Sequence, residues 1–148
     1  MRIKRSFIAV LATVLSFSSF AGKVETPSSL DGVKRVTAAQ AKAAIDSGAA
    51  VYDVRKKAEY LEGHIKGAKS LAYKEKSAKV ANFDMSKDRW KVAKLGADKS
   101  KTIIVYCNGK TCWKSFKSAK TAAKNGYKNV LWLRGGFPEW KAAGFPVE

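Results

Sequence analysis

Short apolar runs that alternate with helix-forming segments constrain the fold of this chain most strongly. The clearest run, residues 102–106, reads Thr-Ile-Ile-Val-Tyr, and such continuous apolar character is typical of a strand buried on both faces of a parallel sheet. Residues 49–54 form a second apolar run, and a helix that ends before a glycine is predicted over 113–125. Alternating strands and helices predict an α/β domain with a largely parallel sheet.

The other elements follow from capping residues, glycines and periodicity. Strands are predicted over 33–36, 68–72 and 130–133, helices over 38–47, 86–95 and 138–143, and a helical turn over 57–62. Thr37 and Ser86 are the expected N-caps of the first two helices. Residues 22–31 lack apolar periodicity and are rich in Ser, Thr and Pro, which predicts a flexible N-terminal lead before a domain over 32–148.

The first residues have the pattern of an export signal. Arg2, Lys4 and Arg5 precede an apolar stretch over 7–20, and a small-residue cleavage pattern ends at Ala21. The apolar stretch is shorter than the ~20 residues that a membrane-spanning helix needs, so the chain is expected to meet the membrane only transiently. The sequence therefore predicts a signal peptide over 1–21, cleaved after Ala21, and a periplasmic or secreted mature protein.

The chain is strongly basic, with a formal net charge of +17. Its lysines are scattered along the sequence without a dense basic run or an interleaved aromatic ladder, so nucleic acid is not expected as a partner. A positive field does attract small anions and acidic proteins, and an acidic protein partner is therefore predicted. With one histidine and two cysteines, the chain is poorly equipped for a closed zinc site, and neither a metal nor another cofactor is expected.

Cys107 stands at the position where α/β domains build their sites, directly after the carboxyl end of a buried strand. A glycine-bearing loop and a predicted helix follow it, so backbone N–H groups and the helix dipole favour a thiolate there. Cys107 is therefore the candidate catalytic nucleophile. The candidate active-site loop comprises Asn108, Gly109, Lys110, Thr111, Trp113 and Lys114, and its two lysines add positive charge.

Three motifs carry a resemblance to the rhodanese-like family. Residues 53–55 (Asp-Val-Arg), 59–60 (Glu-Tyr) and 63–68 (Gly-His-Ile-Lys-Gly-Ala) resemble its N-terminal signature, and 135–140 (Gly-Gly-Phe-Pro-Glu-Trp) its C-terminal one. Cys107 lies between them, where the cysteine loop of that family belongs, and the similarity covers about residues 33–147.

The resemblance implies a doubly wound α/β fold with helices on both faces of the sheet. It also implies a sulfurtransferase that takes sulfane sulfur from a small anionic donor such as thiosulfate, holds it as a persulfide on Cys107, and passes it to a thiophilic acceptor such as a thiol. Supporting roles in tying neighbouring loops together, rather than catalytic roles, are expected for Asp53, Arg55, Glu59 and His64.

The loop departs from the family pattern and leaves two alternatives open. The family's loop commonly has six residues and ends in arginine, whereas the fifth residue after Cys107 here is Cys112. The sixth is Trp113, so the arginine of a Cys-x5-Arg phosphatase loop is absent as well, which argues against phosphatase activity. Cys112 can close a disulfide with Cys107 or resolve a persulfide on it, so a thiol redox protein is one alternative, with Cys112 as the candidate resolving thiol. The other is a catalytically idle binding module, because a fold does not guarantee an activity.

Overall fold

A parallel five-stranded sheet forms the centre of the computed structural model, which describes residues 22–148. The predicted signal peptide, residues 1–21, lies outside the described residues. The strands are β1 (Val33–Arg35), β2 (Ala50–Asp53), β3 (Lys69–Ser70), β4 (Thr102–Tyr106) and β5 (Asn129–Leu133), and the α-helices are α1 (Ala38–Asp46), α2 (Lys57–Glu62), α3 (Trp113–Lys124) and α4 (Gly136–Ala142). The spatial order β1-β5-β4-β2-β3, with every pairing parallel, confirms the predicted α/β architecture.

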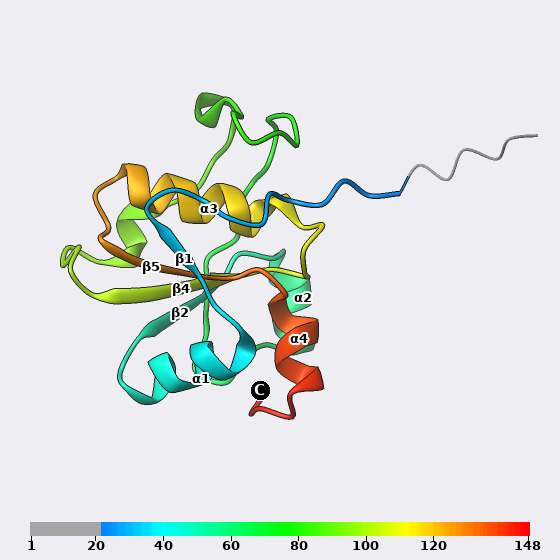
Figure 1. Ribbon diagram of the computed structural model, residues 1–148, viewed down its shortest axis with the longest axis vertical. Coiled ribbons are helices and arrows are strands. Elements are labelled where there is room, and N and C mark those ends of the chain that lie inside the picture. The colour runs from blue at the N-terminus through cyan, green and yellow to red at the C-terminus, as the bar shows by residue number, and fades with distance from the viewer. Residues whose placement is uncertain (1–21) are drawn as a thin grey trace, which may run out of the picture.

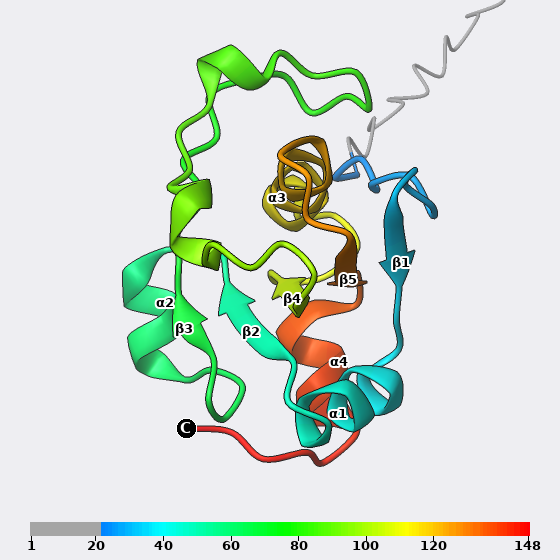
Figure 2. The same cartoon turned by 90° about the vertical axis from the view of Figure 1, so that its left-hand side faces the viewer.

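Helices cover both faces of this sheet. Helix α3 lies on one face, and α1 and α4 lie on the other (Figures 1 and 2). Strand β4 supplies both cores because its side chains alternate: Ile103 and Val105 pack with α3, whereas Ile104 and Tyr106 pack with residues of α1 and α4. Both cores leave β4 buried in the middle of the sheet, so its carboxyl end is held in place from both sides.

Most predicted elements are present within a few residues of their expected bounds. Thr37 forms the predicted N-cap of α1, as a capping box in which its hydroxyl accepts from the Gln40 N–H while the Gln40 side chain accepts from the Thr37 N–H. Gly48, which directly follows the helix predicted over 38–47, has a φ of 99°, a left-handed conformation that glycine adopts at little cost.

The predicted helix over 86–95 is wrong. Two 3-10 turns, Met85–Lys87 and Val92–Leu95, flank an extended segment there. Within it, Arg89 forms an antiparallel bridge with the chain that follows β3, and the Trp90 indole N–H donates to a backbone carbonyl of the same stretch at 2.9 Å. These tertiary hydrogen bonds hold the backbone extended and override the local helical pattern.

A buried lysine fastens the long connection between β3 and β4, residues 71–101, to α3. Lys117 is fully buried, and its Nζ lies 2.8 Å from Glu75 Oε2 and donates to the backbone and hydroxyl oxygens of Ser77 at 3.1 and 2.8 Å. A buried ammonium needs such partners, because an unpaired charge in the interior is very costly. The connection is thus anchored on the face of the sheet that α3 covers.

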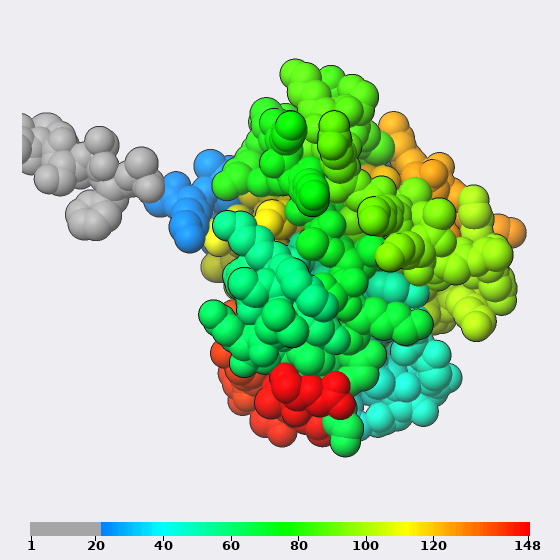
Figure 3. All heavy atoms as spheres, turned by 180° about the vertical axis from the view of Figure 1, so that it is seen from behind, coloured from blue at the N-terminus to red at the C-terminus, as the bar shows by residue number. Residues whose placement is uncertain are grey.

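The C-terminal residues lie at the end of the domain opposite to the connection between β3 and β4 (Figure 1). Figure 3 shows the C-terminal residues in red against the blue-green segment that follows β2. Backbone hydrogen bonds run in both directions between His64 and Glu148, each at 2.9 Å. Within residues 22–148, no helix has the length and apolar character that crossing a bilayer requires.

Helix α4 begins in close contact with the turn that follows β4. The Phe137 N–H donates to the Cys107 carbonyl at 2.9 Å, and Gly136 has a φ of 66°. A Cβ atom added at Gly136 would lie 2.4 Å from the Cys107 carbonyl oxygen and 2.6 Å from the Gly109 nitrogen. Only glycine fits there, so the second glycine of the C-terminal motif, Gly136, is a packing requirement of the cysteine loop.

We expect Gly136→Ala to destabilise the protein more than Gly144→Ala. Both glycines have a left-handed backbone, φ 66° and 74°, but a Cβ at Gly144 meets no atom within 4 Å. Gly144→Ala therefore measures the conformational strain alone, about 1–2 kcal/mol, whereas Gly136→Ala adds an overpacking cost of about 1–3 kcal/mol. Urea unfolding of both variants measures the difference, and equal losses of unfolding free energy would contradict this account.

Candidate active site

The two cysteines are joined by a disulfide at the carboxyl end of β4. Cys107 is the first residue after the strand, and Cys112 is the N-cap residue of α3, with a Cα–Cα distance of 6.2 Å. This distance lies in the usual range for a disulfide. Cys107 is 1% exposed, whereas Cys112 is half-buried. The sulfur expected to act as the nucleophile is therefore held in an oxidised, closed loop.

Backbone contacts define the shape of this loop. Gly109 has a φ of 126°, and the Cys112 N–H donates to the Gly109 carbonyl at 3.0 Å, which closes a turn between the two cysteines. From the other side, the Phe137 N–H binds the Cys107 carbonyl at 2.9 Å. The loop is thus braced by α4 as well as by its own turn, and α3 starts directly behind it.

A buried ion pair ties the neighbouring strand end to the same edge of the sheet. Arg55 donates to the Asp53 carboxylate through Nε at 3.0 Å and Nη2 at 2.6 Å, and Nη2 also donates to the Gly63 carbonyl at 2.6 Å. Asp53 pairs in register with Tyr106, whose hydroxyl donates to Asp53 Oδ2 at 2.8 Å and accepts from the Ile65 N–H at 3.1 Å. These contacts tie the chain after β2 to the end of β4, and the supporting role expected for Asp53 and Arg55 stays a prediction.

Electrostatics keep this network in one protonation state. Burial and the charge of the nearby Asp53 carboxylate raise the pKa of the Tyr106 hydroxyl, so it stays protonated and donates. Burial alone lowers the pKa of Arg55, but its hydrogen bonds to Asp53 and that carboxylate's charge outweigh burial, and the net shift is upward. The Tyr106 hydroxyl therefore remains a donor to Asp53, and Arg55 remains charged beside that carboxylate.

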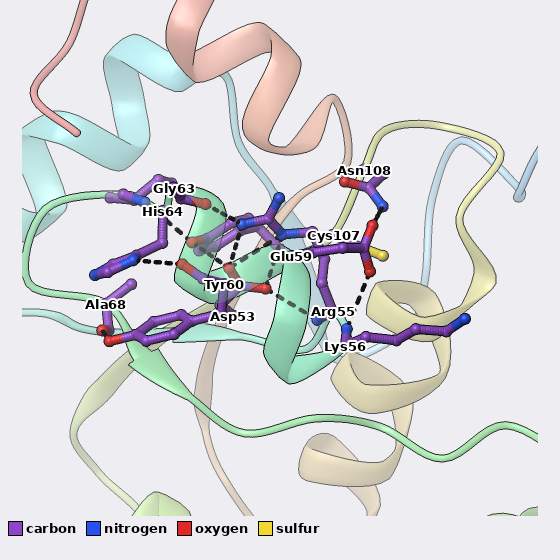
Figure 4. Close-up of polar contacts among 12 residues, drawn as sticks. Asp53, Arg55, Lys56, Glu59, Tyr60, Gly63, His64, Ala68, Cys107 and Asn108 are labelled. Atoms are coloured by element: carbon purple, nitrogen blue, oxygen red, sulfur yellow. Dashed lines mark hydrogen bonds and ion pairs between the residues drawn. The ribbon is translucent and has the colours of Figure 1, made fainter. Parts of the chain in front are cut away.

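Glu59 and His64 come from the same segment but face different parts of the molecule. Glu59 Oε1 accepts from the Asn108 side-chain amide at 2.6 Å, which links α2 to the cysteine loop (Figure 4). The His64 ring stacks on Tyr60, with 3.7 Å between ring centroids, and its Nε2 lies 3.3 Å from a carboxylate oxygen of Glu148. In Figure 4, His64 lies across the Asp53–Arg55 pair from Cys107, so it supports the C-terminus and not the loop.

The loop lysines take unequal positions. Lys110 pairs with Glu25 at 2.8 Å between Nζ and Oε1. Lys114 lies near enough to Glu59 for its charge to contribute to lowering the pKa of that carboxyl. Of the two lysines expected to attract an anion, Lys110 already has a carboxylate partner in this structure.

Sequence reasoning missed an N-terminal contact with the loop. The Thr26 N–H and hydroxyl both donate to the Lys110 carbonyl, at 2.8 and 2.9 Å, and the Trp113 indole N–H donates to the Val24 carbonyl at 3.0 Å. Arg134 then binds the Thr26 carbonyl through Nη2 at 2.6 Å. Composition predicts a flexible lead over 22–31, yet residues 24–26 cross the outer side of the loop in these contacts. No local motif in this segment signals a partner so distant in sequence.

A cavity of about 640 Å³ opens beside the loop. Its lining includes Asn108, Gly109, Lys110 and Thr111 from the loop, with Arg35 and Arg134 from the ends of β1 and β5. A small anion that enters this cavity meets positive charge next to loop backbone. Among residues 22–148, no group of three or more His, Cys, Asp or Glu side chains is arranged to hold a metal ion.

Known proteins share this architecture. Residues 37–143 match the family model of the rhodanese-like domain. An HTH-type transcriptional regulator of Mycobacterium tuberculosis is 30% identical over 96 residues, which cover 65% of this chain and 36% of that protein. The chain thus spans only about a third of that curated relative's length.

Two solved structures illustrate the range of relatives. A Rhodopseudomonas palustris protein described as a possible tyrosine phosphatase is 30% identical, with a TM-score of 0.57 over 78% of this chain and 85% of that one. A thiosulfate sulfurtransferase from Pseudomonas aeruginosa is 25% identical, with a TM-score of 0.55 over 78% of this chain and 20% of that one. Because the family match spans nearly all of the folded domain and these structures repeat its fold, the chain belongs to the rhodanese-like domain family.

Proposed function

We propose that this protein is a sulfurtransferase in which Cys107 carries sulfane sulfur as a persulfide. The observation that carries the proposal is the place of Cys107, at the carboxyl end of the central strand β4, where a braced turn and α3 follow it. The similarity to a thiosulfate sulfurtransferase supports it further. In this proposal the reduced Cys107 thiolate attacks the sulfane sulfur of an anionic donor such as thiosulfate, sulfite leaves with the bonding electron pair, and a thiophilic acceptor later removes the sulfur.

The loop favours this chemistry through its backbone. Helix α3 has twelve residues and begins at Trp113, directly after the loop, and the partial positive charge of its N-terminus is proposed to stabilise a sulfur that carries negative charge before and after transfer. Because Cys112 stands where the six-residue loop of the family commonly ends in arginine, no guanidinium from that position binds the donor. Arg35 and Lys110, which line the cavity beside the loop, are the proposed attractants for the donor.

A thiol redox protein is the second candidate, and the Cys107–Cys112 disulfide favours it. In that case the pair exchanges electrons with a partner dithiol without carrying sulfur. A disulfide fits the oxidising compartment that the N-terminal pattern predicts, since such bonds persist mainly outside the cytosol. Export to the periplasm or beyond and an acidic protein partner stay proposals drawn from the sequence.

Asn108 depends on Glu59 for its position, and we assign Glu59 a positioning role. The Glu59 carboxylate accepts from the Asn108 amide at 2.6 Å and from the Lys56 N–H at 3.1 Å. Partial burial raises the pKa of Glu59, but these hydrogen bonds and the charges of Arg55 and Lys114 outweigh burial and hold the pKa below its usual value. Glu59 therefore stays ionised and keeps α2 linked to the loop at neutral pH.

The sulfurtransferase proposal predicts a persulfide on one residue. After reduction, removal of the reductant and exposure to thiosulfate, the Cys112→Ser variant should gain one sulfur atom on Cys107, and Cys107→Ser should gain none. Mass spectrometry of the intact protein and of its peptides measures this. A wild-type chain that only cycles between dithiol and disulfide, with Cys112→Ser gaining no sulfur, would support the redox alternative. A protein that neither gains sulfur nor cycles between dithiol and disulfide would support the binding module.

The Glu59 link should respond to acid in a definite direction. Because folding lowers the pKa of Glu59, its contribution is present above the unfolded-state pKa of about 4.3 and is lost as the pH falls through the lower folded value. The Asn108 side-chain amide signals in NMR spectra should therefore stay constant from pH 7 to about pH 5 and shift only below about pH 4. Glu59→Gln should remove that transition, and a transition that survives in this variant would exclude Glu59 as its cause.

A further inference from the structure

The transfer of sulfur to Cys107 does not itself require Cys112, yet the structure gives Cys112 a place in the proposed reaction. Cys112 forms a disulfide with Cys107 in a loop that has two backbone hydrogen bonds. The Cys112 N–H donates to the Gly109 carbonyl, and the Phe137 N–H donates to the Cys107 carbonyl. The loop that has both of these hydrogen bonds therefore also accommodates a direct bond between the two sulfur atoms. A thiol so placed lies within reach of any sulfur atom carried by Cys107.

An external acceptor has a harder approach to the same sulfur. Cys107 is 1% exposed, and the outer side of the loop is crossed by residues 24–26, which bind Lys110 and Trp113. Cys112 is already positioned, so its attack is intramolecular and avoids the entropic cost of bringing a second molecule into place. Competition between the two acceptors favours the internal thiol.

The position of Cys112 also suits it as a nucleophile. It is the N-cap residue of α3, a helix of twelve residues that ends at Lys124. Thiols at helix N-termini are more easily ionised than free cysteine, and the thiolate is the attacking form. Within the disulfide, Cys112 is also the half-buried partner and thus the more accessible sulfur for a reductant.

We propose, on the basis of the proposed function, that Cys112 is the internal reductant of the Cys107 persulfide and that the product is sulfide. The Cys112 thiolate attacks the inner sulfur of the Cys107 persulfide and forms the Cys107–Cys112 disulfide. The bond between the inner and outer sulfur atoms breaks, and the outer sulfur leaves with the electron pair as hydrosulfide. The sulfane sulfur is reduced and the two thiols are oxidised, so the charges and atoms balance.

The cycle then requires a dithiol reductant as the partner. Its first thiolate attacks Cys112, the accessible sulfur, and Cys107 leaves as a thiolate ready for a new donor molecule. Its second thiolate resolves the mixed disulfide and frees Cys112. The protein is then a donor-dependent source of sulfide, and the disulfide in the structure is the state that follows sulfide release.

A single-turnover experiment tests this proposal. The reduced wild-type protein is freed of reductant under anaerobic conditions and mixed with one equivalent of thiosulfate, and sulfide, sulfite and protein mass are measured. We expect one equivalent each of sulfite and sulfide, and a protein lighter by the two thiol hydrogens. Cys112→Ser should release sulfite, lose sulfide release, and stay heavier by one sulfur atom, while Cys107→Ser should release neither product.

The outcomes of this experiment distinguish the role of Cys112 from the proposed sulfurtransferase activity. A wild-type protein that keeps its persulfide and releases no sulfide overturns the role of Cys112 and leaves the sulfurtransferase intact. Sulfide release from Cys112→Ser at the wild-type level also overturns that role. If neither wild type nor Cys112→Ser yields sulfite or gains sulfur, the proposed function fails and this inference fails with it. The persulfide retained by Cys112→Ser doubles as the control that its loop is still folded.

Discussion

The hydrogen bond from the Phe137 N–H to the Cys107 carbonyl is the contact on which the site depends. It joins the end of β4 to the start of α4, two elements that meet only because Gly136 has no side chain. With this contact in place, the chain after Cys107 must turn away from the sheet, and Gly109 supplies the left-handed residue of that turn. The cysteine loop is therefore shaped in part by backbone packing from outside the loop.

A second constraint comes from the charges buried at the same edge of the sheet. Asp53 and Arg55 are 0% and 5% exposed, and such a pair tolerates burial only when its remaining hydrogen-bonding groups are satisfied. Tyr106 and the Gly63 carbonyl supply those partners. Because Tyr106 immediately precedes Cys107, the network that satisfies the ion pair also fixes the end of the strand that presents the cysteine.

The sequence predicted what local patterns determine. The apolar run over 102–106 and the glycines around it located the central strand, and Cys107 after it, because burial on both faces leaves a distinct signature. The helix predicted over 86–95 does not form, because pairing of Arg89 with Lys74 in the preceding extended segment overrides the helical spacing. The contacts of Thr26 with the loop and of Arg134 with Thr26 could not be predicted for the same reason, since no residue type in either segment specifies a distant partner.

The loop contains no arginine, and its shape depends on backbone contacts. Trp113 is 4% exposed and packs edge-on against Phe116, and its indole N–H binds the Val24 carbonyl, so this position serves the core and the N-terminal segment. Lys110 has Glu25 as a partner, which offsets part of its charge. For the sulfur anion of the proposed function, the start of α3 is then the remaining source of fixed positive potential, and its direction relative to Cys107 depends on the shape of the turn. Whatever preserves the contact between Gly136 and Cys107 therefore preserves the electrostatics of the site, and a loop without its usual arginine depends on that contact more than one that has it.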